Sequence, residues 1–460
     1  MAAIATPALK SRPRRRSELG LLLVGAIFVV FAEVLVYLGT YNRFPPNLWL
    51  FALILVVMGL VGNIANRALA PEADPVVLPV VLVLNGLGFI MMQRLANSPV
   101  VSAVHLAGYQ AVWSALGLFA YVVTLAVFRH SRDLERYRYL LALAAFILLV
   151  LPLMPGLKDY AADANGAYLW VKLGPASFQP IEISKILLVI FFASYFVEKR
   201  ELLSMATNRV GNRLLPDLRG FGPIAVAWLA SVGIILIERD IGFSLMLFVL
   251  FISMLWVTTG RWTYVLLGIV AFAIGTFVAS HILSQVNTRI EVWLDPWKTL
   301  HTTGYQPAMG EVMMGKGGVT GTGLGLGGAG YIPVAQSDFV FAAIGNELGL
   351  AGTSAVVVAF MIIVGAGVRI ANRAHSDFAK LAAFGLTVIL GIQAFLIMAG
   401  VSRLLPLTGV TLPFVSYGGS SLLANYILIA LLMRISHEGS ADAIAAPAAY
   451  AELPLAHAGG

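Results

Sequence analysis

Long apolar runs recur along almost the whole chain, and this feature constrains the fold more than any other. Each run has about 20 residues, the length that an α-helix needs to cross the hydrocarbon core of a bilayer. The runs lie at roughly 21–39, 47–64, 76–93, 107–128, 138–155, 181–197, 220–237, 241–259, 262–283, 338–368, 379–401 and 410–433. A chain of 460 residues that is 59% hydrophobic and 12% charged cannot hide so much apolar surface in a soluble core. The sequence therefore predicts an all-α polytopic membrane protein with about 12 transmembrane helices.

Positively charged residues are unequally shared between the two sides of this predicted bundle. If the N-terminus lies in the cytoplasm, about two-thirds of the 30 Lys and Arg residues fall in inside segments, as the positive-inside rule requires. Both termini are therefore predicted to be cytoplasmic, and the two long loops, 156–180 and 284–337, to lie on the outer face of the cell membrane. The net charge of +7 then reflects orientation, because no basic face with exposed aromatic residues suggests nucleic-acid binding. The absence of cysteine excludes disulfides, thiolate metal ligands and a cysteine nucleophile.

A glycine-rich segment occupies the second half of the longer outer loop. Gly310, Gly315 and Lys316 have the spacing of a phosphate loop. Gly317 stands where such a loop needs Ser or Thr for magnesium, and no strand precedes it, so nucleotide binding is rejected. The glycines still allow backbone amides to approach an anion closely, such as the pyrophosphate of a lipid. A merely mobile loop is the alternative.

Asp338 follows the glycines at the point where the chain becomes an apolar run. An isolated acid at the mouth of a membrane helix is costly and usually has a function. Asp338 is the one carboxylate placed to act as a general base at the outer face. Glu347 lies deeper in the same run and on another face of the helix, and we expect it to hydrogen-bond inside the bundle.

Two further groups of charged residues lie near the predicted membrane boundaries. Glu182 and Lys185 are three residues apart, so they share a helix face and can pair. They either neutralise each other to lock two helices together or, as we favour, line a polar cavity. A triplet of charges separates two apolar runs and is either a solvated turn or the cap of a helix. Its members are Glu238, Arg239 and Asp240.

Two other segments predict a polar cavity near the outer face. The segment 287–297 alternates polar and apolar residues around two Trp, which suits an interfacial helix with Arg289 facing headgroups. The segment 405–421 contains prolines, adjacent glycines and hydroxyls that break a helix. Such a backbone survives at membrane depth where it lines a cavity or packs on protein, and tight packing of small residues is the alternative. The candidate cavity residues of this segment are Ser416, Gly418, Gly419 and Ser420.

Four motifs, in this order, resemble the SEDS family, whose members include RodA, FtsW and SpoVE. They are FQPIEISK at 178–185, ERDIG at 238–242, GTGLGLGGAGYIPVAQSDFVFAAIGNELGLAG at 321–352 and LPLTGVTLPFVSYGGSSLLAN at 405–425. Two motifs depart from the family pattern, because ERDIG stands for the usual QPDLG and QPIE for the usual QPSE. Most members have about ten spans. The additional N-terminal pair of helices resembles the actinobacterial RodA-type branch.

The resemblance implies how the chain is divided and where its site lies. The parts are a basic cytoplasmic tail (1–19), N-terminal helices that include the additional pair (20–136), the catalytic membrane core (137–436) and a disordered cytoplasmic tail (437–460). The family's essential aspartate falls on Asp338, and its cavity Glu and Lys fall on Glu182 and Lys185. Its SYGGSS stretch falls on residues 416–421.

The resemblance also implies the activity of a peptidoglycan glycosyltransferase, which polymerises lipid II with a class B penicillin-binding protein as its partner. A sugar 4-hydroxyl would attack the anomeric carbon of a lipid-linked donor, with Asp338 as base and with inversion at that carbon. Positive charge would stabilise the departing pyrophosphate, and a divalent cation, Mg or Mn, is a candidate cofactor. The candidate side chains for this charge are Lys185, Arg289, Lys316 and Arg403.

Three alternatives to an elongation polymerase remain open from the sequence. A division polymerase of the FtsW type carries the same motifs. A lipid II flippase would use the same charges and broken helices. It should, however, offer polar sites to both faces, whereas the key polar residues here cluster toward the outer face. A structural scaffold that recruits a transpeptidase is compatible with either activity.

Overall fold

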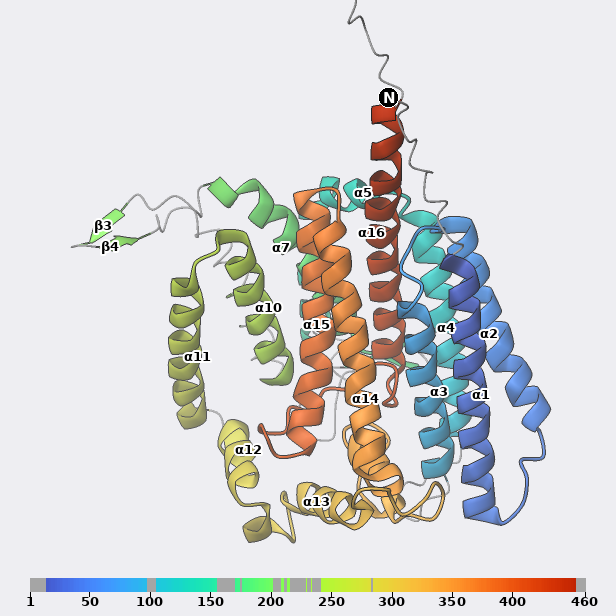
Figure 1. Cartoon of the computed structure of the whole chain (residues 1–460). Helices are drawn as coiled ribbons and strands as arrows, with labels where there is room; N and C mark the ends of the chain where they lie inside the picture. Colours follow the sequence, from blue (N-terminus) through green and yellow to red (C-terminus); the bar gives the residue numbers. More distant parts are fainter. Residues whose placement is uncertain are drawn as a thin grey trace, which may run out of the picture.

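The computed structural model describes residues 14–96, 105–154, 170–173, 176–201, 208–210, 213–215, 229, 233, 241–282 and 284–451. In this part of the chain, long helices form a bundle, and the predicted all-α membrane fold is confirmed (Figure 1). Eight of the described helices are long and apolar enough to cross a membrane. Large apolar side chains such as Phe28, Phe119 and Leu266 are exposed on the bundle, as a lipid-facing surface requires.

The long helices follow the predicted apolar runs. They are α1 (Arg14–Tyr41), α2 (Leu48–Leu69), α3 (Val77–Ala96), α4 (Leu106–Val127), α6 (Arg138–Val150), α7 (Ile181–Glu198), α10 (Ile241–Thr259), α11 (Trp262–Ile282), α14 (Val340–Arg373), α15 (Asp377–Val401) and α16 (Gly419–Ala451). The run predicted at 220–237 lies almost wholly outside the described residues. Glu238, Arg239 and Asp240 also lie outside them.

Shorter elements complete the fold. Several of them lie across the end of the bundle where α14 begins, two residues after Asp338, which we call the Asp338 end (Figure 1). These are α12 (Ser284–Leu294), η4 (Pro296–Thr299), α13 (Tyr305–Gly317) and η5 (Ala329–Tyr331). The remaining short elements are α5 (Ser131–Arg136), η1 (Leu151–Leu153) and two antiparallel hairpins, β1 (Val171–Leu173) with β2 (Ala176–Phe178) and β3 (Asn208–Val210) with β4 (Arg213–Leu215).

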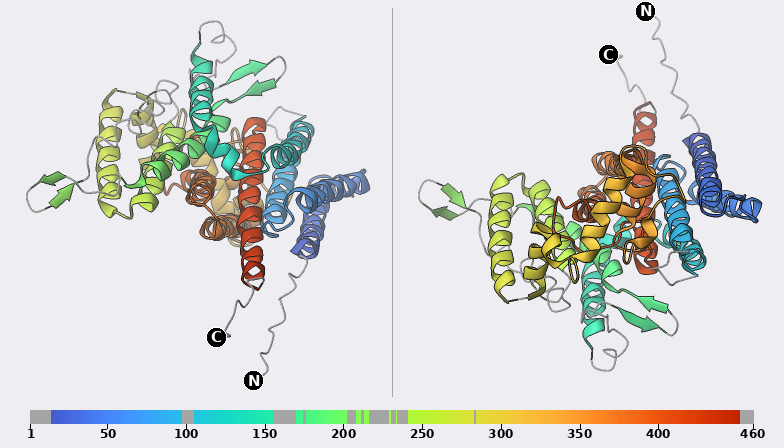
Figure 2. Two further views of the ribbon diagram at one scale, coloured as in Figure 1. Left: turned by 90° about the horizontal axis from the view of Figure 1, so that it is seen from above. Right: turned by 90° about the horizontal axis from the view of Figure 1, so that it is seen from below.

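The helices are arranged around α14, α15 and α16, which occupy the middle of the bundle. Helices α1 and α2 lie at one edge and α11 at the opposite edge (Figures 1 and 2). Helix α7 is apolar on nearly every face and is buried along most of its length, because neighbouring helices cover it on several sides. The bundle thus surrounds a buried polar pair on α7, which is described below.

Three predicted features differ from the structure. Helix α16 begins at Gly419 instead of 410, and the segment before it is irregular, with positive φ at Gly409 and Phe414. The helix also continues through Ala451, where the sequence predicts disorder from residue 437. The first residue of this extension contacts the turn between α2 and α3, where Glu72 N donates to His437 Nδ1 at 3.2 Å. The first glycines of the glycine-rich segment lie in helix α13 and not in a loop.

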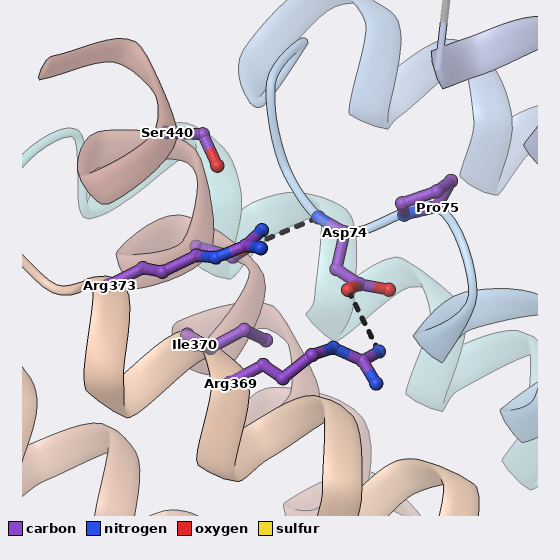
Figure 3. A pocket seen from close by; sticks show the side chains of 7 residues that line it. Asp74, Pro75, Arg369, Ile370, Arg373 and Ser440 are labelled. Carbon is purple, nitrogen blue, oxygen red and sulfur yellow. Dashed lines mark hydrogen bonds and ion pairs between the residues drawn. The ribbon is translucent and has the colours of Figure 1, made fainter. Parts of the chain in front are cut away.

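At the end opposite Asp338, the turn between α2 and α3 is attached to α14 and α16. Asp74 Oδ2 lies 3.4 Å from Arg369 Nη2, and Asp74 N donates to Ser436 Oγ at 3.0 Å (Figure 3). A space of about 140 Å³ lies between these residues and Arg373. This turn therefore links the N-terminal helices to the helices in the middle of the bundle.

Candidate active site

Asp338 lies half-buried in the turn immediately before α14. The irregular segment between α15 and α16 fixes this turn through two hydrogen bonds. Ser416 Oγ donates to Ser337 O at 2.6 Å, and Tyr417 N donates to Gln336 O at 2.8 Å. The structure therefore brings the turn that carries Asp338 together with the SYGGSS stretch, although about 80 residues separate them.

A second polar group is buried inside the bundle. Glu182 and Lys185 on α7 are paired, and they are 1% and 3% exposed. Lys185 Nζ also donates to Gln393 Oε1 on α15 at 2.6 Å, and Gln393 Nε2 donates to Thr411 O at 3.0 Å. Thr411 Oγ1 donates to Ser421 Oγ at the start of α16 at 2.8 Å. These bonds join α7, α15 and α16 through one continuous network.

The hydrogen bonds of this network link three helices, as expected of a pair that locks helices together. A void of about 10 Å³ lies beside Lys185 within the described part of the chain. Whether the Glu182–Lys185 pair also lines a cavity for the substrate stays a prediction. Gln393 was missed from the sequence, although a polar residue in an otherwise apolar run is a signal that could have found it.

The SYGGSS stretch joins the two polar groups. Ser420 Oγ accepts a hydrogen bond from Gln179 N, just before α7, at 2.9 Å. A Cβ added to Gly419 would lie 2.1 Å from the ring of Trp113, and one added to Gly418 would lie 3.2 Å from Thr411. Gly419 therefore serves close packing between α16 and α4, and Gly418 packs within the irregular segment that precedes α16.

The glycines after α13 lie between Gly318 and Gly330, and from here on these residues are called the glycine-rich segment. They pack their backbone against the first turns of α14. Thr322 N donates to Asn346 O and Gly323 N donates to Glu347 O, each at 3.0 Å. A Cβ on Gly321 would lie 2.1 Å from Glu347 O, so glycine is needed for this approach. These amides bind within the protein. The expectation that the glycines leave them available to an anion is therefore wrong for this part of the segment.

Glu347 is fully buried and pairs with Arg94 at the end of α3. Arg94 Nη2 donates to Gly327 O at 2.8 Å, and Gly325 N donates to Glu347 Oε2 at 2.9 Å. The prediction that Glu347 hydrogen-bonds inside the bundle is confirmed. Arg94 was missed, because its local sequence carries no sign of a partner 253 residues away.

Three of the candidate cations lie at the Asp338 end. Arg289 Nη1 donates to Thr408 O at 3.1 Å, and Arg403 Nη1 lies 2.7 Å from Glu311 Oε1. Both guanidinium groups therefore have protein partners, whereas Lys316 is exposed on α13. Lys316 is the candidate with the greatest access to an anion in solution.

A divalent cation would need several oxygen or nitrogen ligands close together. Within the residues that the structure describes, no group of three or more His, Cys, Asp or Glu side chains is placed to hold a metal ion. Asp338 is therefore not part of a cluster of three such side chains in this part of the chain.

These features define a polytopic membrane protein with a polar site at one end of its helical bundle. Residues 75–441 match the family of FtsW, RodA and SpoVE, which is described as cell cycle proteins. The chain belongs to this family. Helices α1 and α2 precede the matched residues, and the match begins earlier than the core boundary predicted at 137.

Individual relatives agree with this assignment. The chain is 40% identical to the peptidoglycan glycosyltransferase RodA of Mycobacterium tuberculosis over 436 residues, which cover 94% of this chain and 92% of the relative. It is 32% identical to a probable peptidoglycan glycosyltransferase FtsW of Geobacter sulfurreducens over 370 residues, which cover 79% of this chain and 95% of that relative.

Solved structures share the fold. A chain of a peptidoglycan synthase complex matches with a TM-score of 0.65 and 24% identity, covering 80% of this chain and 98% of that chain. RodA of Thermus thermophilus matches with a TM-score of 0.56 and 23% identity, covering 79% of this chain and 96% of that chain. At these identities the likeness establishes the arrangement of the helices.

Proposed function

We propose that this chain is a peptidoglycan glycosyltransferase that polymerises lipid II, with Asp338 as its general base. The observation that carries the proposal is the placement of Asp338, half-buried in a turn that Ser416 and Tyr417 fix. A base must keep one orientation and still be reached by its substrate. A half-buried carboxylate on a fixed turn meets both needs. The activity named for the relatives supports the same reaction.

In this reaction a sugar 4-hydroxyl gives its proton to Asp338 while its oxygen attacks the anomeric carbon of the donor. The bond from that carbon to the pyrophosphate breaks, and polyprenyl pyrophosphate leaves with the bonding electrons. A single displacement inverts the anomeric carbon. Because pyrophosphate is a good leaving group, it needs nearby positive charge more than a second carboxylic acid. Lys316 supplies such charge, whereas Arg289 and Arg403 chiefly hold α12 and α13 in place.

The orientation of the chain follows from its charges. The Asp338 end faces outward and both termini are cytoplasmic, since the inside segments then carry the excess of Lys and Arg. The partner is a class B penicillin-binding protein, in line with the peptidoglycan synthase complex among the similar structures. The greater identity to the RodA relatives favours a role in elongation over division.

Two assays on the same purified chain test the activity. In the first, the full chain with its partner receives lipid II, and glycan strands are separated by gel electrophoresis. In the second, the chain is reconstituted into vesicles that contain fluorescent lipid II, and translocation of the headgroup is measured against protein-free vesicles. The proposal expects strands and no translocation. Translocation without strands would assign the chain to the flippases instead.

A further inference from the structure

Helix α1 lies against the glycine-rich segment that precedes Asp338, although α1 itself comes before the residues that match the family. The contact is close at two glycines. A Cβ on Gly39 of α1 would lie 2.2 Å from Leu324 O, and a Cβ on Gly325 would lie 2.6 Å from Val36 O. Real Cβ atoms essentially never come within 3.0 Å of another atom. A larger residue at either position would therefore force the backbone of α1 and the glycine-rich segment apart.

A second contact joins α1 to the end of α3. Gln93 Nε2 donates to Tyr37 OH at 3.0 Å, and Glu33 is buried one turn earlier on α1. The next residue of α3, Arg94, binds in another direction to Glu347 on α14. The last turn of α3 therefore lies between α1 and the helix that follows Asp338, and it has polar contacts to both.

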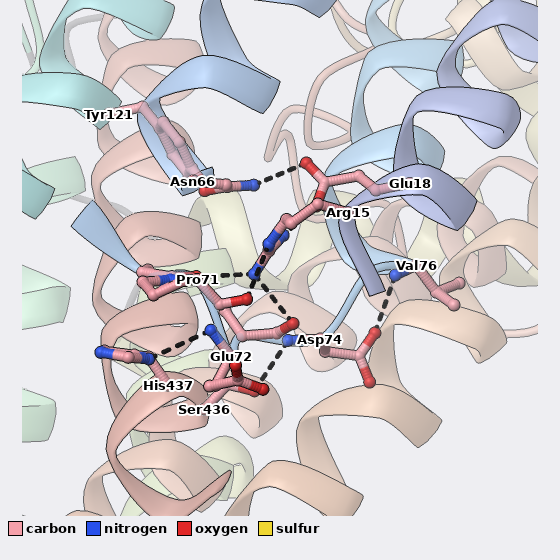
Figure 4. A network of polar contacts seen from close by, with 12 residues as sticks. Arg15, Glu18, Asn66, Pro71, Glu72, Asp74, Val76, Tyr121, Ser436 and His437 are labelled. Carbon is pink, nitrogen blue, oxygen red and sulfur yellow. Dashed lines mark hydrogen bonds and ion pairs between the residues drawn. The ribbon is translucent and has the colours of Figure 1, made fainter. Parts of the chain in front are cut away.

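The opposite end of α1 is anchored as well (Figure 4). Arg15 pairs with the buried Glu18, and its Nη2 donates to Ala70 O at 2.6 Å and to Ala73 O at 3.0 Å. Asn66 Nδ2 donates to Glu18 Oε1 at 2.9 Å. The turn that receives these bonds is itself attached to α14 and α16. Helix α1 thus has fixed contacts at both ends of its 28 residues, which span about 42 Å.

We propose that α1 is a positioning element for the candidate active site. Through Gly39 it fixes the glycine-rich segment, and this segment in turn holds the first turns of α14 that follow Asp338. Gly39 itself touches no reacting atom. A displacement of about 1 Å at a catalytic group can reduce turnover about 100-fold. A shift that passes from Gly39 through the glycine-rich segment to α14 would therefore lower the rate. The proposal rests on the glycosyltransferase function proposed above.

The test compares Gly39→Val with Gly20→Val in the full chain with its partner. Gly20 lies on the same helix, and a Cβ added there meets no atom within 4 Å, so it reports the general effect of valine on α1. We expect Gly39→Val to lower kcat for lipid II polymerisation about 10- to 100-fold, with KM close to that of Gly20→Val and with the chain still folded at the assay temperature. Gly39→Ala should give a smaller loss in the same direction. Wild-type kcat in both Gly39 variants would overturn the proposal. A kcat that falls only because less of the chain is folded at the assay temperature would also overturn it.

Hydrogen exchange at residues 321–327 provides a second measurement that does not depend on activity. Within this stretch the amides of Thr322, Gly323 and Gly325 donate to α14. We expect these three amides to exchange at least about tenfold faster in Gly39→Val than in Gly20→Val, because their bonds to α14 loosen. Equal exchange in the two variants would overturn the proposal. If the wild-type chain makes no glycan while exchange still differs, the proposed function fails and the support of the segment by α1 stands.

Discussion

Arg94 Nε lies 2.8 Å from Glu347 Oε1, and this ion pair joins the end of α3 to α14. The Glu347 side chain is fully buried and that of Arg94 is 12% exposed. The same carboxylate accepts a hydrogen bond from Gly325 N, and the same guanidinium donates one to Gly327 O. Two helices and the glycine-rich segment therefore meet at a single buried charge pair, whose Glu347 lies nine residues after Asp338.

This relationship predicts a non-additive pair of substitutions. Arg94→Gln leaves the Glu347 carboxylate buried without its cation, which should cost about 3–5 kcal/mol of unfolding free energy. Adding Glu347→Gln removes the unpaired charge, so the double variant should regain part of that loss. Unfolding in detergent by denaturant measures both. If the two substitutions are additive, so that Glu347→Gln destabilises Arg94→Gln as much as it destabilises the wild type, the two side chains are not energetically coupled and the prediction is wrong.

Ser416→Ala removes the side chain that holds the Asp338 turn. The loss of the bonds to Ser337 O and from Leu412 N should cost about 1–3 kcal/mol and lower kcat more than KM changes. Ser402→Ala is the matched control, because Ser402 is exposed in the same irregular segment and its hydroxyl donates to Ala399 O in its own preceding turn. Equal polymerisation rates in the two variants would count against the role of Ser416.

The buried pair on α7 should behave as a lock. Lys185→Met leaves the Glu182 charge buried and alone, so we expect little folded protein. Lys185→Met with Glu182→Gln removes both charges and should restore folding. Size-exclusion profiles and Tm measure this recovery. If the pair also has a chemical role, the folded double variant will make no glycan, whereas a lock alone predicts that it retains activity in proportion to its folded fraction.

Lys316 and Arg403 should give opposite results. Lys316 is exposed, so Lys316→Gln should leave Tm unchanged and raise KM for lipid II a few-fold, with the effect shrinking as salt screens the charge. Arg403→Gln should lower Tm, because Arg403 bonds to Glu311 and to the carbonyl of Trp293. Steady-state kinetics at two salt concentrations test both. A salt-independent KM in Lys316→Gln would remove Lys316 from the pyrophosphate site.

The sequence was sufficient to predict most of the described long helices and the place of Asp338 just before α14, because apolar length and an isolated acid are local signals. It could not reveal the contacts between distant segments. Arg94 with Glu347 and Gly39 with Leu324 depend on how helices pack, and no period or motif encodes their pairing. The glycines show the same limit. Their number indicates close approach, but only the fold shows that Gly321 approaches α14 and Gly325 approaches α1.

Asp338→Asn gives the most direct test of the central claim. The amide keeps the size of the side chain but cannot accept the proton of the sugar hydroxyl, and general-base catalysis contributes about 10²- to 10⁴-fold. Lipid II polymerisation by the purified chain with its partner should therefore fall by at least about 100-fold, while Tm and membrane insertion match the wild type. An Asp338→Asn chain that polymerises lipid II at the wild-type rate would contradict the account.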